Sequence, residues 1–198
     1  MPLPRTYSFD NGTTLEAGFT QQYTAAPVIE ISGLGYTPGG PSAAFDSANS
    51  YGAAHFSEVT LDSTINESGP TVCAKEQDAN KDHYFGKCYS TQFWQVFKCL
   101  DGTDTQIGST GTFTASALGR DVVADDVFRL EYSGGTLTVK VNGITIDTQS
   151  GDAALTTGGA GFRVSPGNLR AWQGGNLGAA GADLSVDLHE PVIGSTVF

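Results

Sequence analysis

The stretch FRLEYSGGTLTVKVNG, residues 128–143, decides the fold class of this chain. Apolar and polar residues alternate on both sides of Ser133-Gly134-Gly135, and a period of two residues is that of a half-buried β-strand. Residues 136–141 place Leu and Val on one face and Thr and Lys on the other. Asn142-Gly143 follows, which is the strongest short-range signal of a β-hairpin turn. The stretch predicts two antiparallel strands and a third strand over residues 144–147.

The same pattern of short alternating runs continues outward from this hairpin. Further strands are predicted over residues 28–31, 55–61, 72–76, 84–89, 93–100, 160–165 and 182–188. We expect loops over residues 35–42 and 166–181, where Gly is frequent, and an end to the central meander at Asp101-Gly102-Thr103. No segment has an apolar period of 3.6 residues over a helical length. The sequence therefore predicts an all-β fold, a two-sheet antiparallel jelly-roll sandwich, as a single β-sandwich domain over residues 1–198.

Charge and hydropathy exclude several classes of partner. The 198 residues carry a formal net charge of −11 with only 10 Lys and Arg. No nucleic-acid partner is predicted, because affinity for nucleic acid comes from neutralising phosphates. No membrane insertion is predicted either, because no apolar run approaches the roughly 20 residues of a membrane helix. The first residues have no basic region followed by an apolar one, so we expect no secretion signal.

The cysteines are Cys73, Cys88 and Cys99. Their number is odd and their spacing fits no metal-binding pattern. Three reduced thiols, in a protein that folds in a reducing cytoplasm, are the favoured interpretation. A single bridge between Cys73 and Cys88 across a hairpin stays open.

Three stretches, taken in their order along the chain, resemble a known superfamily. They are FDNGTTL at residues 9–15, the hairpin at residues 128–143 and TGGAGF at residues 157–162. Together they resemble the concanavalin-A-like lectin/glucanase (laminin-G-like) superfamily, and the resemblance covers most of the chain. It implies a concanavalin-A-like sandwich, but this fold carries lectins, hydrolases, lyases, adhesion modules and virion proteins. The lone domain is similar to stand-alone members among bacteriophage virion proteins.

The residues argue against catalysis. The enzymes of this superfamily carry a Glu-x-Asp-x-x-Glu motif on one strand, and the sequence has none. The nearest group is Glu58 and Asp62, which share a strand face but lie about 13 Å apart at about 3.3 Å per residue. Glycosidases need carboxyl groups about 5 to 9.5 Å apart. We predict no catalytic residues and no enzyme. A glycoside hydrolase or polysaccharide lyase ranks third among the functions considered.

An Asp-x-Asn-x-Asp string offers a weak metal hypothesis. Asp78, Asn80 and Asp82 alternate in the way that calcium ligands do in binding loops. The glycine of such a loop is replaced by His83, and its final Glu by Tyr89. A polar hairpin turn accounts for the same residues, so no cofactor is predicted, and Ca²⁺ is kept as the alternative.

A glycan site is predicted around one tryptophan. Sugar rings dock on aromatic faces while nearby polar groups bind the hydroxyls. Trp172 lies in a Gly-rich stretch near Asn168 and Arg170, and these three are the tentative glycan-binding residues. Trp94, which alternates with apolar residues, is predicted to lie in the core.

These observations favour a non-catalytic structural or adhesion protein on a virion surface. Capsid decoration or a tail-associated role, such as in a tail fibre, is expected, with assembly in the host cytoplasm. The predicted partners are other virion or assembly proteins, a cell-surface glycan bound weakly, and further copies in a homo-oligomer. A stand-alone carbohydrate-binding, lectin-like module is the alternative.

Overall fold

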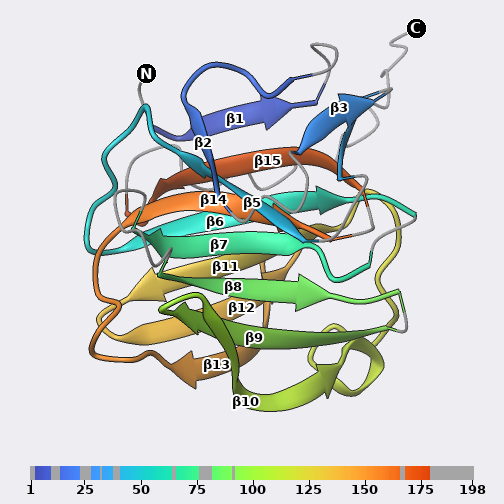
Figure 1. Ribbon diagram of the computed structural model, residues 1–198. Coiled ribbons are helices and arrows are strands. Elements are labelled where there is room, and N and C mark those ends of the chain that lie inside the picture. The colour runs from blue at the N-terminus through green and yellow to red at the C-terminus, as the bar shows by residue number, and fades with distance from the viewer. Residues whose placement is uncertain are drawn as a thin grey trace, which may run out of the picture.

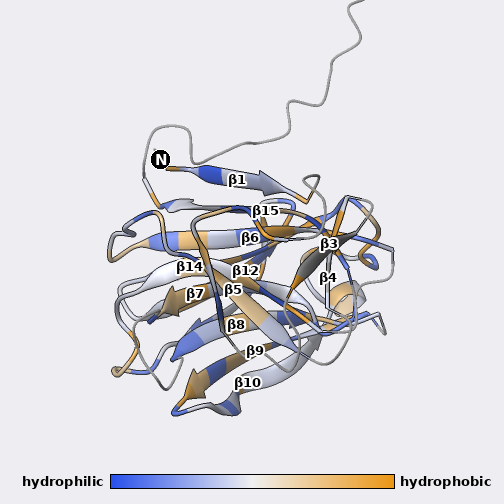
Figure 2. Ribbon diagram, turned by 45° about the horizontal axis from the view of Figure 1, so that its top comes forward, coloured by the Kyte–Doolittle hydropathy of each residue, from blue (hydrophilic) through white to orange (hydrophobic). Residues whose placement is uncertain are grey.

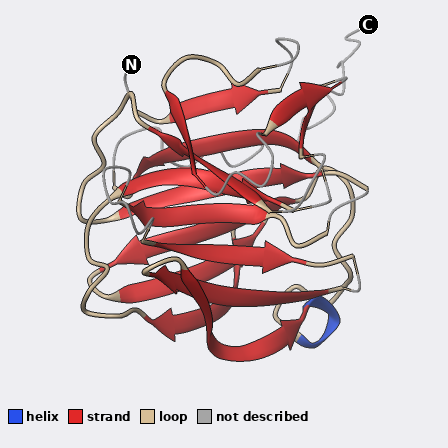
Figure 3. Ribbon diagram, viewed as in Figure 1, coloured by secondary structure: helices blue, strands red, loops and turns tan. Residues whose placement is uncertain are grey.

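The computed structural model describes residues 3–9, 14–22, 28–31, 33–37, 41–63, 66–75, 82–90, 92–165 and 168–178. Figure 3 shows that strands dominate these residues, with one short 3₁₀ turn, η1. The elements are β1 (Arg5–Ser8), β2 (Phe19–Gln22), β3 (Ile29–Ile31), β4 (Leu34–Tyr36), β5 (Ser42–Asp46), β6 (His55–Leu61), β7 (Gly69–Ala74), β8 (His83–Cys88), β9 (Phe93–Leu100), β10 (Thr103–Thr112), η1 (Phe113–Ala115), β11 (Val127–Ser133), β12 (Thr136–Val141), β13 (Ile144–Ser150), β14 (Gly159–Val164) and β15 (Leu169–Asn176). The described residues include no helix that is long and apolar enough to cross a bilayer.

The strands form two antiparallel sheets that pack face to face (Figure 1). Sheet A has the order β13-β12-β11-β6-β15-β4-β3, with β1 paired to β15. Sheet B has the order β10-β9-β8-β7-β14-β5-β2. The all-β, two-sheet sandwich predicted from the sequence is thereby confirmed.

Alternation along the strands builds the core between the sheets. In β12, Leu137, Val139 and Val141 are buried, and the residues between them are partly exposed. Figure 2 shows the same mixture of hydrophobic and hydrophilic residues along single strands. The predicted bounds of the strands at 55–61, 93–100 and 136–141 agree with β6, β9 and β12. Trp94 is buried as predicted.

The loop predicted over residues 166–181 is wrong, because β15 occupies Leu169–Asn176. Its glycines serve close packing. A Cβ on Gly174 would lie 2.6 Å from the Trp172 ring, and one on Gly175 would lie 2.7 Å from the Phe56 ring. Glycine within a strand often marks such a close approach.

Two other expectations are also wrong. Residues 35–42 are not one loop, since they contain the end of β4 and the start of β5. The meander does not end at Asp101-Gly102-Thr103. Asp101 and Gly102 have φ angles of 51° and 73°, and they form a tight turn from which β10 returns along β9. The strand predicted over residues 182–188 lies outside the described residues.

The three cysteines are buried and none is bonded to another. Burial raises the pKa of Cys73 to about 12 and also raises the pKa of Cys88. Thiols of this kind are poor nucleophiles, because the reactive species is the thiolate. Of the two states considered from the sequence, the structure has three thiols with no disulfide between them.

One hydrogen-bonded group joins the sheets through the core. The Trp172 indole N–H, from β15 of sheet A, lies 2.9 Å from Ser57 Oγ and 3.0 Å from the Gly161 carbonyl oxygen of sheet B. The Ser57 hydroxyl also donates to this carbonyl. A buried indole N–H needs a partner, and here the partner lies in the opposite sheet.

The neutral side chain of His55 links the backbone at Gly52 to the backbone of β7 at Cys73. It is fully buried, and its Nε2 accepts a hydrogen bond from the Cys73 backbone N–H at 3.0 Å. Its Nδ1 lies 2.9 Å from the Gly52 carbonyl oxygen, to which it therefore donates. Burial lowers the pKa of His55, against the smaller opposing effect of the Gly52 hydrogen bond.

Removing the hydrogen bond between the sheets is expected to destabilise the fold. Trp172→Phe should lower the free energy of unfolding by about 2 to 4 kcal/mol, because it removes the buried indole hydrogen bonds to Ser57 and Gly161 and opens a small cavity. Trp94→Phe should cost less, since its indole N–H lies 3.4 Å from Asp147 in a weaker bond. Urea denaturation followed by tyrosine fluorescence measures both. Equal losses in the two variants would contradict the role given to Trp172.

His55 is expected to make stability depend on pH. Because its native pKa lies below the unfolded value of about 6.5, its contribution is complete above pH 6.5 and is lost as the pH falls towards the native pKa. The slope of unfolding free energy from this group should reach at most about 1.4 kcal/mol per pH unit. Urea titrations between pH 8 and 5 should show a smaller slope in His55→Gln than in the wild type. An unchanged slope would assign the effect to other groups.

Candidate functional site

The candidate site lies on the outer face of sheet A, opposite the core. Register places one row of side chains across the middle strands of this face. The row consists of Thr6, Gln173, Glu58, Arg129 and Lys140, which are cross-strand partners in β1, β15, β6, β11 and β12. Their chain neighbours, such as Val59 and Leu130, point into the core instead.

A network of ion pairs holds one half of this row. Arg129 Nε lies 2.8 Å from Glu131 Oε1, and Arg129 Nη1 lies 3.5 Å from Glu58 Oε2. Lys140 Nζ binds the same Glu131 oxygen at 2.9 Å. The Arg129 guanidinium also lies 3.7 Å from the centre of the Phe56 ring. Arg129 and Glu131 are the centre of this network, since each contacts more than one of the other side chains.

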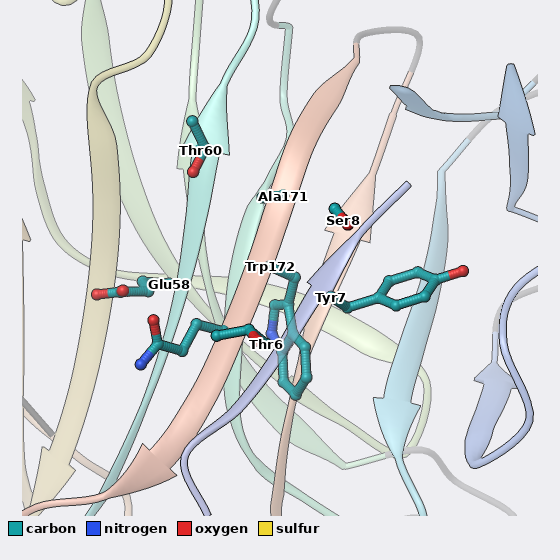
Figure 4. Close-up of a pocket in the computed structure, with 8 residues that line it drawn as sticks. Thr6, Tyr7, Ser8, Glu58, Thr60, Ala171 and Trp172 are labelled. Atoms are coloured by element: carbon teal, nitrogen blue, oxygen red, sulfur yellow. The ribbon is translucent and has the colours of Figure 1, made fainter. Parts of the chain in front are cut away.

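A shallow hollow of about 220 Å³ lies beside the network, over β1, β15 and β6. Figure 4 shows these strands side by side, with Glu58 extending towards β11. The polar residues that line it are Thr6, Ser8, Glu58, Thr60 and Gln173. Ala171, which pairs with both Ser8 and Thr60, contributes only a methyl group. The hollow therefore has a small side chain at its floor and hydroxyl, amide and carboxylate groups at its rim.

Gln173 is the one described side chain lining this hollow that has a buried hydrogen-bond donor without a partner. It is only 8% exposed, and its Nε2 has no hydrogen-bond partner in the part of the chain that the structure describes. An unsatisfied buried donor costs about 1 to 3 kcal/mol. Such exceptions in a native protein call for an explanation, and a ligand acceptor is one.

Trp172 does not occupy the position predicted for it. Its ring is 1% exposed and packs edge-on against Phe19, with ring centroids 5.2 Å apart. No face of the ring is open for stacking on a sugar, so the predicted role as a stacking platform is wrong. Gln173, the next residue along β15, faces the opposite side of the sheet.

The two other predicted glycan residues are not brought together with Trp172. Arg170 is exposed, and its guanidinium binds Asp62 at 3.0 Å and Asp125 at 2.7 Å. Hydrogen bonds to these two carboxylates raise the pKa of Arg170. Asn168 precedes β15 and is half-buried. Asp62 thus contacts Arg170, whereas Glu58 contacts Arg129, and the two carboxylates belong to separate groups.

The calcium hypothesis falls mostly on residues outside the described ranges. Asp78 and Asn80 lie outside the described residues. Asp82 lies just before β8, where its Oδ1 accepts a hydrogen bond from the Asp101 backbone N–H at 2.8 Å. Within the described ranges, no three His, Cys, Asp or Glu side chains gather as metal ligands would.

Comparison with solved structures identifies the fold. A carbohydrate binding module, CBM66 from Bacillus subtilis, matches 86% of this chain and 95% of its own with a TM-score of 0.54 at 16% identity. A prokaryotic β-1,3-1,4-glucanase (lichenase) from a mouse hindgut metagenome matches 87% and 98% with a TM-score of 0.56 at 12% identity. An endo-β-1,3-glucanase from Pyrococcus furiosus matches 87% and 93% with a TM-score of 0.57 at 8% identity.

No protein-family model matches the sequence, and a search of curated proteins finds no significant match. At these identities the structural likeness shows the fold alone. The bacteriophage origin expected from the sequence receives no support from these comparisons. The structure and its neighbours together show that the chain has the concanavalin-A-like lectin/glucanase fold.

Proposed function

We propose that this chain is a carbohydrate-binding domain whose sugar site is the hollow on the outer face of sheet A. The observation that carries the proposal is the nearly buried Gln173 amide, whose Nε2 has no hydrogen-bond partner among the described residues and whose cross-strand partner is Glu58. This function was the alternative to a virion role in the sequence interpretation.

The chemistry of the hollow suits sugar hydroxyl groups. Each hydroxyl donates one hydrogen bond and accepts others. Glu58 accepts, Gln173 donates, and the hydroxyls of Thr6 and Ser8 do both. Gln173 and Glu58 are direct cross-strand partners, so donor and acceptor lie about 5 Å apart at the backbone. Neighbouring hydroxyl groups of one sugar ring can bind such a pair.

The site offers hydrogen bonds in place of an aromatic platform. The Trp172 and Phe56 rings near it are buried. Each hydrogen bond contributes only about 0.5 to 1.5 kcal/mol, so we expect weak affinity for a single sugar. Display in many copies would raise the overall affinity without new contacts.

The fold neighbours support the class of ligand. CBM66 is described as a carbohydrate binding module, and two other neighbours are described as glucanases. The virion-surface role, as capsid decoration or a tail component with virion partners, remains a prediction that neither the geometry nor these neighbours address.

We also propose that the face binds sugar without cleaving it. A glycosidase places two carboxyl groups on either side of open space that holds the scissile bond. Glu58 and Glu131 are the carboxylates of the ion-pair network on this face, and the Arg129 guanidinium is in contact with both. That contact supports a fixed, non-catalytic arrangement.

The Gln173→Met variant is expected to separate binding from stability. It removes the unsatisfied amide while keeping the length of the side chain. The free energy of unfolding should stay the same or rise by about 1 kcal/mol, while affinity for the bound glycan falls about threefold to tenfold. A glycan array identifies the ligand, and calorimetry with chemical denaturation measures both effects.

Two further variants control this experiment. Ala171→Phe fills the hollow and should abolish binding, whereas Gln106→Met on the exposed strand β10 should leave binding unchanged. A protein that binds no glycan on the array contradicts the proposal. So does binding that survives both Gln173→Met and Ala171→Phe.

No cleavage of soluble polysaccharides is expected from the wild-type protein. The assay measures new reducing ends and unsaturated products after long incubation with a panel of polysaccharides. Cleavage that disappears in Glu58→Gln or Glu131→Gln would overturn the non-catalytic proposal while leaving the site in place.

A further inference from the structure

Lys75 differs from every other cation in the described part of the chain. Each other lysine and arginine there lies within 4 Å of a carboxylate oxygen. Lys75 has no such contact with a described residue, and among the described residues its Nζ donates to the Ala154 carbonyl oxygen, at 3.1 Å. In a chain with a formal net charge of −11, carboxylates are abundant. A lysine without one is therefore the exception that needs a reason.

The position of Lys75 supplies that reason. It follows β7 and lines a second hollow, of about 350 Å³, at one end of the sandwich. The other lining residues are Asn49, Ser50, Tyr51, Ala74, Gly158 and Gly159. This volume lies at the lower end of the range of small-molecule sites, about 300 to 1,000 Å³. The hollow has room for one sugar-sized ligand, which a bare inorganic ion would not fill.

The wall formed by Asn49 and Tyr51 is fixed from behind. Both side chains donate to Asp46 Oδ2 at 2.7 Å. Asp46 is fully buried and is also paired with the buried Arg5 guanidinium. Its carboxylate is thus neutralised inside the protein and does not compete for Lys75. The ring of Tyr51, an amide and a hydroxyl are left at the hollow.

Backbone forms the opposite wall. Gly158 has a φ angle of +142°, and a Cβ there would lie 2.4 Å from the Cys73 carbonyl carbon. Glycine is therefore required for this close approach to β7. Gly159 pairs with Ala74 in the sheet. The wall next to Lys75 consequently carries no side chain that could screen its ammonium group.

We propose that this hollow binds an acidic sugar, with the ligand's carboxylate on the Lys75 ammonium group. Two N–H groups of the ammonium are left for the carboxylate, in charge-assisted hydrogen bonds that are stronger than neutral ones. Asn49 and Ser50 bind hydroxyl groups of the same ring, and Tyr51 lines its apolar side. The site shares no residue with the sheet-face hollow, so either proposal can fail alone.

Calorimetry with three probes at constant ionic strength tests the proposal. The probes are sodium glucuronate, glucose as its neutral counterpart, and sodium sulfate as a free anion. Glucuronate should bind at least about tenfold more tightly than glucose, which is the scale of a charge-assisted hydrogen bond. Sulfate should bind more weakly than glucuronate, because it makes none of the contacts of the sugar ring.

Substitutions test whether the preference for glucuronate over glucose depends on Lys75. Lys75→Met should abolish the preference for glucuronate, and Lys75→Arg should retain most of it. Lys87→Met removes the same charge from a lysine paired with Glu67 and should leave glucuronate binding unchanged. Circular dichroism confirms that each variant is folded.

Three results would overturn the proposal. They are the absence of saturable glucuronate binding, binding that is unchanged in Lys75→Met, and sulfate binding as tight as glucuronate binding. The last result would identify a site for free anions. Loss of sheet-face binding in Gln173→Met with glucuronate binding intact would leave both proposals standing.

Discussion

The hydrogen bond between the Trp172 indole and the Gly161 carbonyl is the constraint on which the rest of the structure depends. It ties the middle of sheet A to the middle of sheet B, with the Ser57 hydroxyl as the third member. Gly161 has no alternative, because a Cβ there would lie 2.2 Å from the Ala44 carbonyl oxygen. Trp172 and Ser57 fix β15 and β6 through their core-facing side chains. Because successive residues of a strand face opposite sides, the positions of Gln173 and Glu58 on the outer face are then fixed too. The position of the sheet-face site is thus a consequence of how the core satisfies one indole N–H.

Much of the fold could be predicted from the sequence, because its central strands alternate cleanly. The hairpin around Asn142-Gly143 and the strand of Trp94 are examples. Prediction failed where glycine was interpreted as a loop residue. In β15, Gly174 and Gly175 lie in a strand because neighbouring aromatic rings occupy the space that a side chain would take. Whether a glycine serves a turn or a close approach depends on residues distant in sequence, and no local pattern records it.

The sites were harder to predict than the fold. Trp172 was interpreted as a binding residue on composition, although the polar side chain that meets the hollow is its neighbour Gln173. Along β6, Glu58 looks like any solvated strand carboxylate until the register places it opposite Gln173. Lys75 stands out because no carboxylate oxygen of the described residues lies within 4 Å of it, a property that depends on the folded structure and not on a sequence pattern. Sequence patterns predict which residues share one face of a strand. A binding site depends also on which residues of neighbouring strands the register places side by side.

One edge of the sandwich has a consequence for how the protein behaves at high concentration. Sheet B ends at β10, whose residues are almost all exposed. A long exposed edge strand is a template on which other chains can pair and form fibrils. β10 counters this with a register irregularity between Ile107 and Gly111, and Ile107 is its only large apolar residue. The ladder that an incoming strand would extend is therefore interrupted. The irregularity in β10 and the net negative charge of the chain both oppose pairing between copies at this edge.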